Sequence, residues 1–298
     1  MTRIRSTNSG MIQDRRGSGG GGLGGMFGGG GGGIPLPGKV GGGLFGIILT
    51  LAVLFLPRLL NGQGTSSLVN SNGGSSAADV NDGSCNSELE SIICGATEDV
   101  QGYWQREFQA LGRQYEPTQT VFFSGATSTG CGQASSETGP FYCPEDHLVY
   151  LDLDFLAQLQ DQFSAQGDLA SQYIVAHEYG HHVQNLLGTN AQVQQAAQQH
   201  PDMANQYSVA LELQADCYAG MWAKDAAARN MFDQPNEIQE ALNAAAAVGD
   251  DRIQQRTQGR VDPETFTHGT SEQRVTWFRR GYDSGDLNQC NTFPEIVG

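Results

Sequence analysis

Residues 1–84 differ in composition from the rest of the chain, and this difference predicts that globular folding is confined to residues 85–298. Between Gly17 and Gly43, 17 of the 27 residues are glycine. A stretch with so few apolar side chains cannot bury enough surface to offset the loss of backbone entropy on folding. We therefore predict that residues 1–39 form a disordered, glycine-rich segment.

An uncharged apolar run, Val40–Leu56, follows this segment. At 1.5 Å per helical residue, the run and its flanks nearly span a hydrocarbon core of roughly 30 Å. We predict one transmembrane helix at residues 40–60. Five of the six basic residues in the first 60 positions precede it, and the positive-inside rule then places residues 1–39 in the cytoplasm and exports the rest. A cleaved signal peptide is the alternative, but its charged leader would be unusually long.

The region after the predicted anchor divides into a linker and one domain. Residues 61–84 are rich in Gly, Ser and Asn, which is typical of a flexible linker. Residues 85–298 then form one domain of ordinary size. The formal net charge of the chain is −16. The first 60 residues carry six basic residues and one acidic residue, so their charge is about +5, and the remaining 238 residues carry −21. A region this acidic has no basic surface of the kind that binds nucleic acid.

All cysteines of the chain lie after the predicted anchor, at Cys85, Cys94, Cys131, Cys143, Cys217 and Cys290. An even number of cysteines in an exported region predicts disulfides, although six cysteines allow 15 pairings. Proximity in the sequence favours Cys85–Cys94 and Cys131–Cys143, which leaves Cys217–Cys290. Free buried thiols are the alternative.

Short β-branched and aromatic runs in the first half of the domain predict a small sheet. They lie at residues 120–125, 140–143 and 147–155 and are separated by Gly, Ser and Pro turns. A helix at residues 99–111 is predicted before them, because apolar residues recur there at helical spacing.

The second half of the domain is predicted to be helical. The predicted helices run from an N-cap at Asp168 to a stop at Gly188, from Pro201 onward, from near Pro235 to just before Gly249, and after the capping box Thr270-x-x-Gln273. A small sheet followed by helices indicates an α+β fold.

The stretch VAHEYGHHVQ, residues 175–184, lies in a predicted helix and can hold a metal ion. Residues four apart on a helix lie nearly above one another, so His177 and His181 can share one ion. His182 points about 140° away from His177, and we expect it to be packed or exposed. Glu178 completes an H-E-x-x-H motif. In this motif two imidazoles hold Zn²⁺ and the glutamate takes a proton from the zinc-activated water.

A catalytic zinc usually has a third protein ligand, which must come from elsewhere in this chain. The motif with a third histidine on the same helix is absent, because Gln184 and Leu187 occupy its glycine and histidine positions. The later stretch ELQAD instead offers Glu212 as the third ligand. Asp216, one helical turn further, can accept the free N–H of a liganding histidine. Both acids lie in an otherwise apolar run, where unpaired carboxylates would be costly.

Several segments together resemble the neutral zinc metallopeptidase family of bacterial membrane proteins. They are HEYGHHVQN, ELQADCYAG, PFYCPEDHLVYLDLDF and FTHGTSEQRVTWFRRGY, and the resemblance extends from Asp99 to the C-terminus. It implies a zincin-like domain with His177 and His181 as zinc ligands, Glu178 as catalytic base and Glu212 as third ligand.

Peptide hydrolysis also needs a hydrogen-bond donor for the developing oxyanion besides zinc. His268, which precedes the predicted capped helix, is our candidate, with Tyr207 as the second choice. We expect His147 and His200 to be structural. By analogy with the usual order of zincin elements, the strand at residues 147–155 is hypothesised to be the edge that pairs with an extended peptide.

We therefore predict a single-pass, membrane-anchored zinc peptidase whose domain acts on peptide or protein substrates outside the cytoplasmic membrane. The alternative is an exported, zinc-stabilised module that binds envelope proteins without catalysis. A closed structural zinc site would need a fourth ligand, for which only Asp216 or His268 is a visible candidate. A zinc hydrolase of a non-peptide amide or ester is a third reading.

Overall fold

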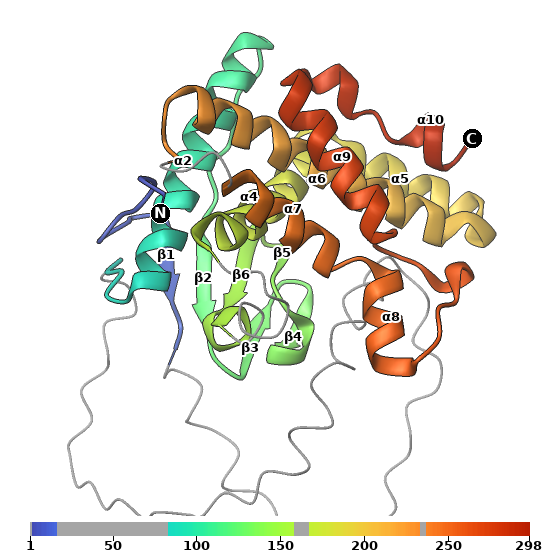
Figure 1. Ribbon diagram of the computed structural model, residues 1–298, viewed down its shortest axis with the longest axis horizontal. Helices are drawn as coiled ribbons and strands as arrows, with labels where there is room; N and C mark the ends of the chain where they lie inside the picture. The colour runs from blue at the N-terminus through green and yellow to red at the C-terminus, as the bar shows by residue number, and fades with distance from the viewer. Residues whose placement is uncertain (1, 17–82, 158–166, 233–236) are drawn as a thin grey trace, which may run out of the picture.

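The computed structural model describes residues 2–16, 83–157, 167–232 and 237–298 (Figure 1). Its main sheet has the strand order β1-β2-β6-β5, with β1 at Ile12–Asp14, β2 at Thr120–Phe123, β6 at Leu148–Asp152 and β5 at Phe141–Cys143. Strands β1, β2 and β6 are parallel, and β5 is antiparallel to β6. A separate antiparallel hairpin is formed by β3 (Ala126–Thr129) and β4 (Gly132–Ser135).

The helices pack over the sheet and enclose most of the core. They are α2 (Glu88–Ala110), α4 (Asp168–Leu187), α5 (Thr189–Gln199), α6 (Ala204–Ala228), α7 (Glu237–Ala247), α8 (Asp250–Gln258), α9 (Ser271–Ser284) and α10 (Phe293–Ile296). Helix α4 contacts α2, α6 and α7, and α6 also packs along α9 (Figure 1). The predicted α+β class is confirmed.

Two glycines allow α6 and α9 to lie unusually close together. A Cβ atom on Gly281 of α9 would lie 1.9 Å from the carbonyl oxygen of Cys217, and one on Gly220 of α6 would lie 2.0 Å from that of Phe278. Any side chain at either position would therefore push the helices apart. This close contact sets the first turn of α9 against the polar residues of α6.

Three disulfides are present, in the pairing that sequence proximity favoured: Cys85–Cys94, Cys131–Cys143 and Cys217–Cys290. They account for all six cysteines of the chain. The third bond ties α6 to the segment after α9, and the second ties the β3–β4 hairpin to strand β5.

Residues 2–16 are folded, so the prediction of disorder over residues 1–39 is wrong for this part. Strand β1 pairs in parallel with β2, and Ile4 and Ile12 are buried in the core. A three-residue strand carries no periodic signal, and its partner lies far along the chain, so local pattern could not reveal it. The predicted anchor at residues 40–60 and nearly all of the predicted linker lie outside the described residues.

None of the helices in the described parts of the chain combines the length and the apolar composition that crossing a bilayer requires.

Helix boundaries differ from the prediction at several places. Helix α2 begins 11 residues earlier than expected, after a capping box between Ser87 and Glu90. Helices α5 and α8 were not predicted, because few of their residues are apolar. The N-cap of α4 is Gly167, while the carboxylate of Asp168 accepts hydrogen bonds from the backbone N–H of Thr2 and from Arg5. The capping box of α9 is present as predicted.

The hypothesis that residues 147–155 form the sheet edge is wrong. Strand β6 lies between β2 and β5, and among the described strands β5 forms the sheet edge beside α4. The apolar run of β6 is typical of an interior strand buried on both faces, which explains its composition.

Candidate metal centre

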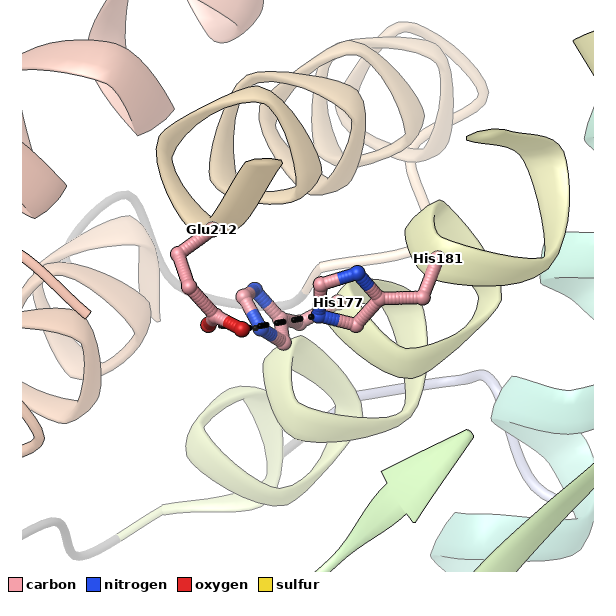
Figure 2. Close-up of side chains that lie close together, drawn as sticks. All are labelled: His177, His181 and Glu212. Carbon is pink, nitrogen blue, oxygen red and sulfur yellow. Dashed lines mark hydrogen bonds and ion pairs between the residues drawn. The ribbon is translucent and has the colours of Figure 1, made fainter. Parts of the chain in front are cut away.

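His177 and His181 of α4 and Glu212 of α6 converge on one point (Figure 2). The Nε2 atom of His177 lies 3.2 Å from Oε2 of Glu212, and Nε2 of His181 lies 3.4 Å from Oε1. All three side chains are largely buried. Among the described residues, these three form the one group of His, Cys, Asp and Glu that can hold a metal ion.

The two helices meet at this level because Gly180 has no side chain. A Cβ atom on Gly180 would lie 3.0 Å from Cα of Ala215 and 3.1 Å from its carbonyl oxygen. Gly180 occupies the last variable position of the H-E-x-x-H motif, and Ala215 lies between Glu212 and Asp216. The motif therefore provides two metal ligands and also the glycine that allows α4 and α6 to pack closely.

The geometry of the donor atoms fits zinc. Ligand atoms at 2.0–2.2 Å from a tetrahedral ion lie roughly 3.3–3.6 Å apart. His177 and His181 reach such distances to different oxygens of Glu212, and one donor atom from each of the three residues lies within 4.8 Å of the others. A small shift of the side chains would therefore place all three donors around one ion. Two imidazole nitrogens and one carboxylate oxygen are also the donor set of catalytic zinc sites that keep one position open.

Hydrogen bonds fix the orientation of both imidazoles. Nδ1 of His177 lies 2.9 Å from Oδ1 of Asp216, and Nδ1 of His181 lies 2.8 Å from Oε1 of Gln184. The amide of Gln184 is itself oriented, since its Nε2 donates to the carbonyl oxygen of Leu211. Because both Nδ1 atoms donate to oxygens, Nε2 of each ring is the nitrogen that can bind a metal once it is deprotonated.

The carboxylates make the site attractive to a cation. Burial lowers the pKa of His177, but Asp216 and Glu212 outweigh this effect and raise the pKa to about 10. Burial likewise raises the pKa of Glu212, but the two histidines lower it well below its usual range. In the metal-free chain a proton is therefore held where a metal would bind, and metal binding must release it.

Glu178 follows His177 on α4 and does not belong to the group of converging ligands. It is buried, and it lines the same cavity as the three ligands. Burial raises the pKa of its carboxyl group above the ordinary value. A general base works best when its pKa approaches the working pH, so this environment suits proton transfer.

A cavity of about 210 Å³ opens over the metal centre. Its walls are mainly apolar and aromatic, with contributions from Pro140, Phe141, Tyr142, Phe155, Ile174, Leu211 and Val248. The edge strand β5 thus forms one side of the cavity, and helices α4 and α6 form its floor with the ligands.

His268 also lines this cavity, and a buried acid orients it. Nδ1 of His268 lies 3.1 Å from Oδ1 of Asp250. The other oxygen of Asp250 accepts the backbone N–H groups of Thr267, His268 and Gly269. Burial lowers the pKa of His268, but Asp250 outweighs it and raises the pKa. Tyr207, the second candidate, is not among the residues that line the cavity.

Asp216 and Arg274 form a buried ion pair behind His177. Nε and Nη2 of Arg274 donate to the two oxygens of Asp216 at 2.8 and 3.0 Å. Burial would raise the pKa of Asp216, but Arg274 and His177 lower it. Asp216 therefore stays charged, and both of its oxygens are engaged away from the metal position.

The remaining histidines lie outside the metal centre, as predicted. His182 is buried, and its Nε2–H donates to the carbonyl oxygen of Glu116 at 2.7 Å. Its Nδ1 accepts from the hydroxyl of Tyr142 at 3.1 Å. Burial lowers the pKa of His182 to about 4, so it is neutral near pH 7. His147 lies in the turn before β6, and His200 is exposed at the end of α5.

Sequence reasoning missed Gln184, Asp250 and Arg274. Gln184 could have been found, since it lies three residues after His181 on the same helix face. Asp250 and Arg274 gave no signal, because each acts on a partner in a different element.

Comparison with known proteins agrees with this geometry. The family model described as "Putative neutral zinc metallopeptidase" matches residues 1–293. The chain belongs to this family.

Two relatives share substantial sequence with this family member. Protein YpfJ of Escherichia coli (strain K12) is 44% identical over 292 residues, which cover 96% of each chain. Protein Rv2575 of Mycobacterium tuberculosis (strain ATCC 25618 / H37Rv) is 55% identical over 181 residues, or 57% of this chain and 60% of the relative. No solved structure matches the chain.

We expect the purified chain to bind one zinc ion, and His181→Ala to abolish this binding. The substitution removes one of three ligands, whereas His200→Ala changes an exposed histidine and should retain the metal. Elemental mass spectrometry after dialysis measures both. Equal zinc content in the wild-type chain and His181→Ala would rule out this metal centre.

Proposed function

We propose that the chain is a zinc-dependent peptidase with a zincin-like domain. The observation that carries the proposal is that two helices bring a His₂Glu donor set together beneath a cavity that Glu178 also lines. The placement of α4 against a sheet whose antiparallel edge strand borders the cavity supports the zincin-like reading.

The free edge of β5 suits an extended peptide. A peptide that pairs with this edge would extend the sheet, and its alternate side chains would meet the apolar cavity wall. We propose this edge, in place of β6, as the site that aligns the substrate backbone.

Bound zinc would supply Lewis-acid activation of water and of the scissile carbonyl group. Glu178 accepts the proton of the attacking water and then returns it to the leaving amine. His268 donates a hydrogen bond to the carbonyl oxygen as negative charge develops on it, and Asp250 holds the imidazole for this task.

The donor count argues against a purely structural zinc site. A closed site needs four protein ligands, and the group of converging donors in the described chain has three. Arg274 occupies both oxygens of Asp216, and Asp250 engages His268. Hydrolysis requires an open coordination position on the zinc ion, and a structural zinc site has none.

We propose that the domain acts outside the cytoplasm. All six cysteines are in disulfides, which persist in oxidising compartments and are rare in the cytosol.

Replacement of Glu178 by Gln should abolish hydrolysis and leave zinc binding intact. General-base catalysis contributes about 10²–10⁴-fold, and the amide cannot accept the proton. The assay uses an unstructured protein substrate with and without a chelator, and zinc content is measured in parallel. Glu272→Gln, at an exposed position of α9, is the matched control. Cleavage by the zinc-loaded Glu178→Gln variant at the wild-type rate would refute the proposed role.

His268→Phe should lower kcat by about 10²-fold with little change in zinc content. One oxyanion donor typically contributes this much, and phenylalanine keeps the ring but removes both nitrogens. Asp250→Asn should cause a smaller loss of kcat, since His268 remains but is held less firmly. Steady-state kinetics on a fluorogenic peptide measures both, with His200→Phe as control. An unchanged kcat in His268→Phe would remove this residue from the mechanism.

A further inference from the structure

Arg274 is the one arginine among the described residues that line the cavity. It lies in the first turn of α9 and is 3% exposed, so its charge is almost fully removed from water. A buried guanidinium is costly unless carboxylates and other acceptors compensate it. The hydrogen-bond and ion-pair partners of Arg274 therefore indicate its role in the site.

Those partners connect Arg274 to the metal ligands on two sides. Besides Asp216, its Nη2 donates to the hydroxyl of Tyr173 at 3.2 Å. The same nitrogen lies 3.3 and 3.4 Å from the two ring nitrogens of His177 and 3.9 Å from Oε2 of Glu212. Tyr173 in turn donates to Asp216, so both oxygens of this carboxylate are held.

The arrangement restricts where Asp216 and His177 can lie. A bidentate pair between a guanidinium and a carboxylate defines the carboxylate plane as well as its position. Asp216 accepts Nδ1–H of His177, and this bond sets the direction of Nε2. Without Arg274, Oδ2 of Asp216 would lose its guanidinium donor, and the Tyr173 hydroxyl and the His177 ring would be left to hold the carboxylate through Oδ1.

We propose that Arg274 is a positioning residue of the metal centre, which holds Asp216 in the place from which it orients His177. The role extends the proposed zinc peptidase function and rests on it. Arg274 acts through Asp216, so the two residues should be coupled in their effect on zinc affinity. Partners of liganding histidines typically contribute 10–100-fold to metal affinity.

The test is a double-mutant cycle in the full-length chain, with zinc affinity measured by competition against a chromogenic chelator. Arg274→Gln and Asp216→Asn should each weaken zinc binding 10–100-fold. The double variant, in which two neutral amides face each other, should bind zinc no more weakly than the weaker single variant. Arg274→Lys should recover part of the loss. Arg280→Gln, on the same helix with an exposed ion pair to Glu295, should match the wild type.

Circular dichroism and the absorption spectrum of the cobalt-substituted chain accompany the affinities. A folded Arg274→Gln variant with wild-type affinity and an unchanged cobalt spectrum would overturn the proposal, as would losses that multiply in the double variant. If Arg274→Gln does not fold, the Arg274→Lys variant provides the same comparison. No substrate is used, so a chain that shows the coupling but cleaves no peptide contradicts the proposed function alone.

A second inference follows from the N-terminal segment, residues 2–16, which is built into the domain. The register of β1 on β2 pairs Ile12 with Thr120 and Asp14 with Phe122. Backbone hydrogen bonds also join this segment to three separate parts of the later chain. Arg3 N–H donates to the carbonyl oxygen of Met231, Ser6 N–H to that of Ser91, and Arg15 N–H to that of Phe122.

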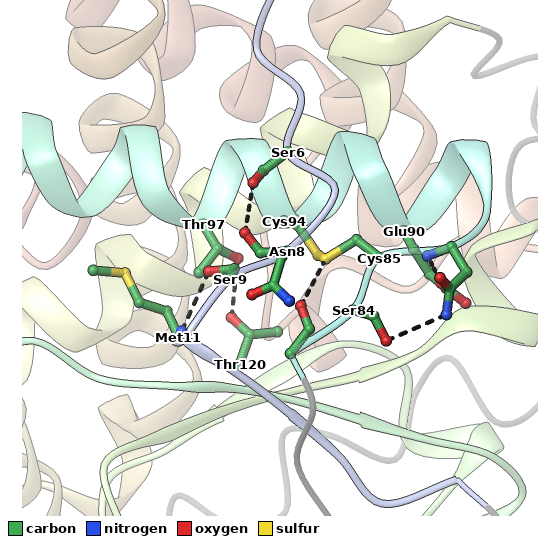
Figure 3. The surroundings of a disulfide bond; sticks show 12 residues. Ser6, Asn8, Ser9, Met11, Ser84, Cys85, Glu90, Cys94, Thr97 and Thr120 are labelled. Atoms are coloured by element: carbon green, nitrogen blue, oxygen red, sulfur yellow. Dashed lines mark hydrogen bonds between the residues drawn. A yellow bond between two sulfur atoms is a disulfide. The ribbon is translucent and has the colours of Figure 1, made fainter.

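Close packing and ion pairs reinforce the contact. Arg5 pairs with Asp168 at 2.8 Å, and Arg16 pairs with Glu90 at 2.6 Å. A Cβ atom on Gly95 of α2 would lie 2.6 Å from Cα of Arg5, so the two backbones touch. Figure 3 shows Ser6, Asn8 and Ser9 running beside α2 and the Cys85–Cys94 disulfide.

Residues 16 and 83 therefore both belong to the same folded domain. Ser9 N–H donates to the carbonyl oxygen of Gly83 at 2.7 Å, and Cys85 N–H donates to that of Thr7 at 3.0 Å. Paired strands lie about 4.8 Å apart, whereas the hydrocarbon core of a bilayer is about 30 Å thick. A chain that crossed the membrane once between these residues could not form these bonds.

We infer that residues 2–16 and the metal centre lie on the same side of the membrane. The single-pass arrangement with residues 1–39 in the cytoplasm and the domain outside is incompatible with the β1–β2 pairing.

Cysteine labelling tests the shared side directly. Since all six native cysteines are in disulfides, single cysteines can be introduced at Gly10, where a Cβ meets nothing within 4 Å, and at Gln198, on the exposed face of α5. A membrane-impermeant maleimide is applied to intact cells and to lysed cells. We expect both cysteines to react in intact cells, or both to react only after lysis. Labelling of one and protection of the other in intact cells would overturn the inference.

Discussion

The contact between Gly180 of α4 and Ala215 of α6 is the constraint on which the metal centre depends. A side chain at position 180 would press on the backbone of α6. At a contact of 3.0 Å the backbone of α6 would have to shift by a few tenths of an ångström, and Glu212 would move relative to the two histidines. The same contact brings Asp216 behind His177, so ligand geometry and ligand orientation share one cause.

Charge is the second constraint on this part of the molecule. Glu178, Glu212 and Asp216 are clustered at one site, and buried carboxylates without compensation are strongly destabilising. Arg274 supplies one positive charge, and a zinc ion would supply two, which together balance the three acids. The pKa of His177 is raised because the same carboxylates favour a positive charge at this position, and without a metal a proton on His177 provides it.

The parts of the site that sequence reasoning could predict are those that obey a helical period. His177, His181 and Glu178 follow from one period, and Glu212 and Asp216 from another. Arg274 and Asp250 could not be predicted, because each contacts residues of other elements through the tertiary fold. Strand β1 was missed for a similar reason: three residues carry too little pattern, and pairing with β2 decides their conformation. The sheet edge was misassigned because apolar composition indicates burial and does not indicate neighbours.

The proposed chemistry requires that two imidazoles and one carboxylate hold zinc beneath an open cavity. X-ray absorption at the zinc edge of the purified chain tests it most directly. We expect nitrogen and oxygen neighbours only, about four in number at about 2.0–2.1 Å, with the outer-shell scattering of two imidazoles. A sulfur neighbour at about 2.3 Å, or a shell without imidazole scattering, would contradict it.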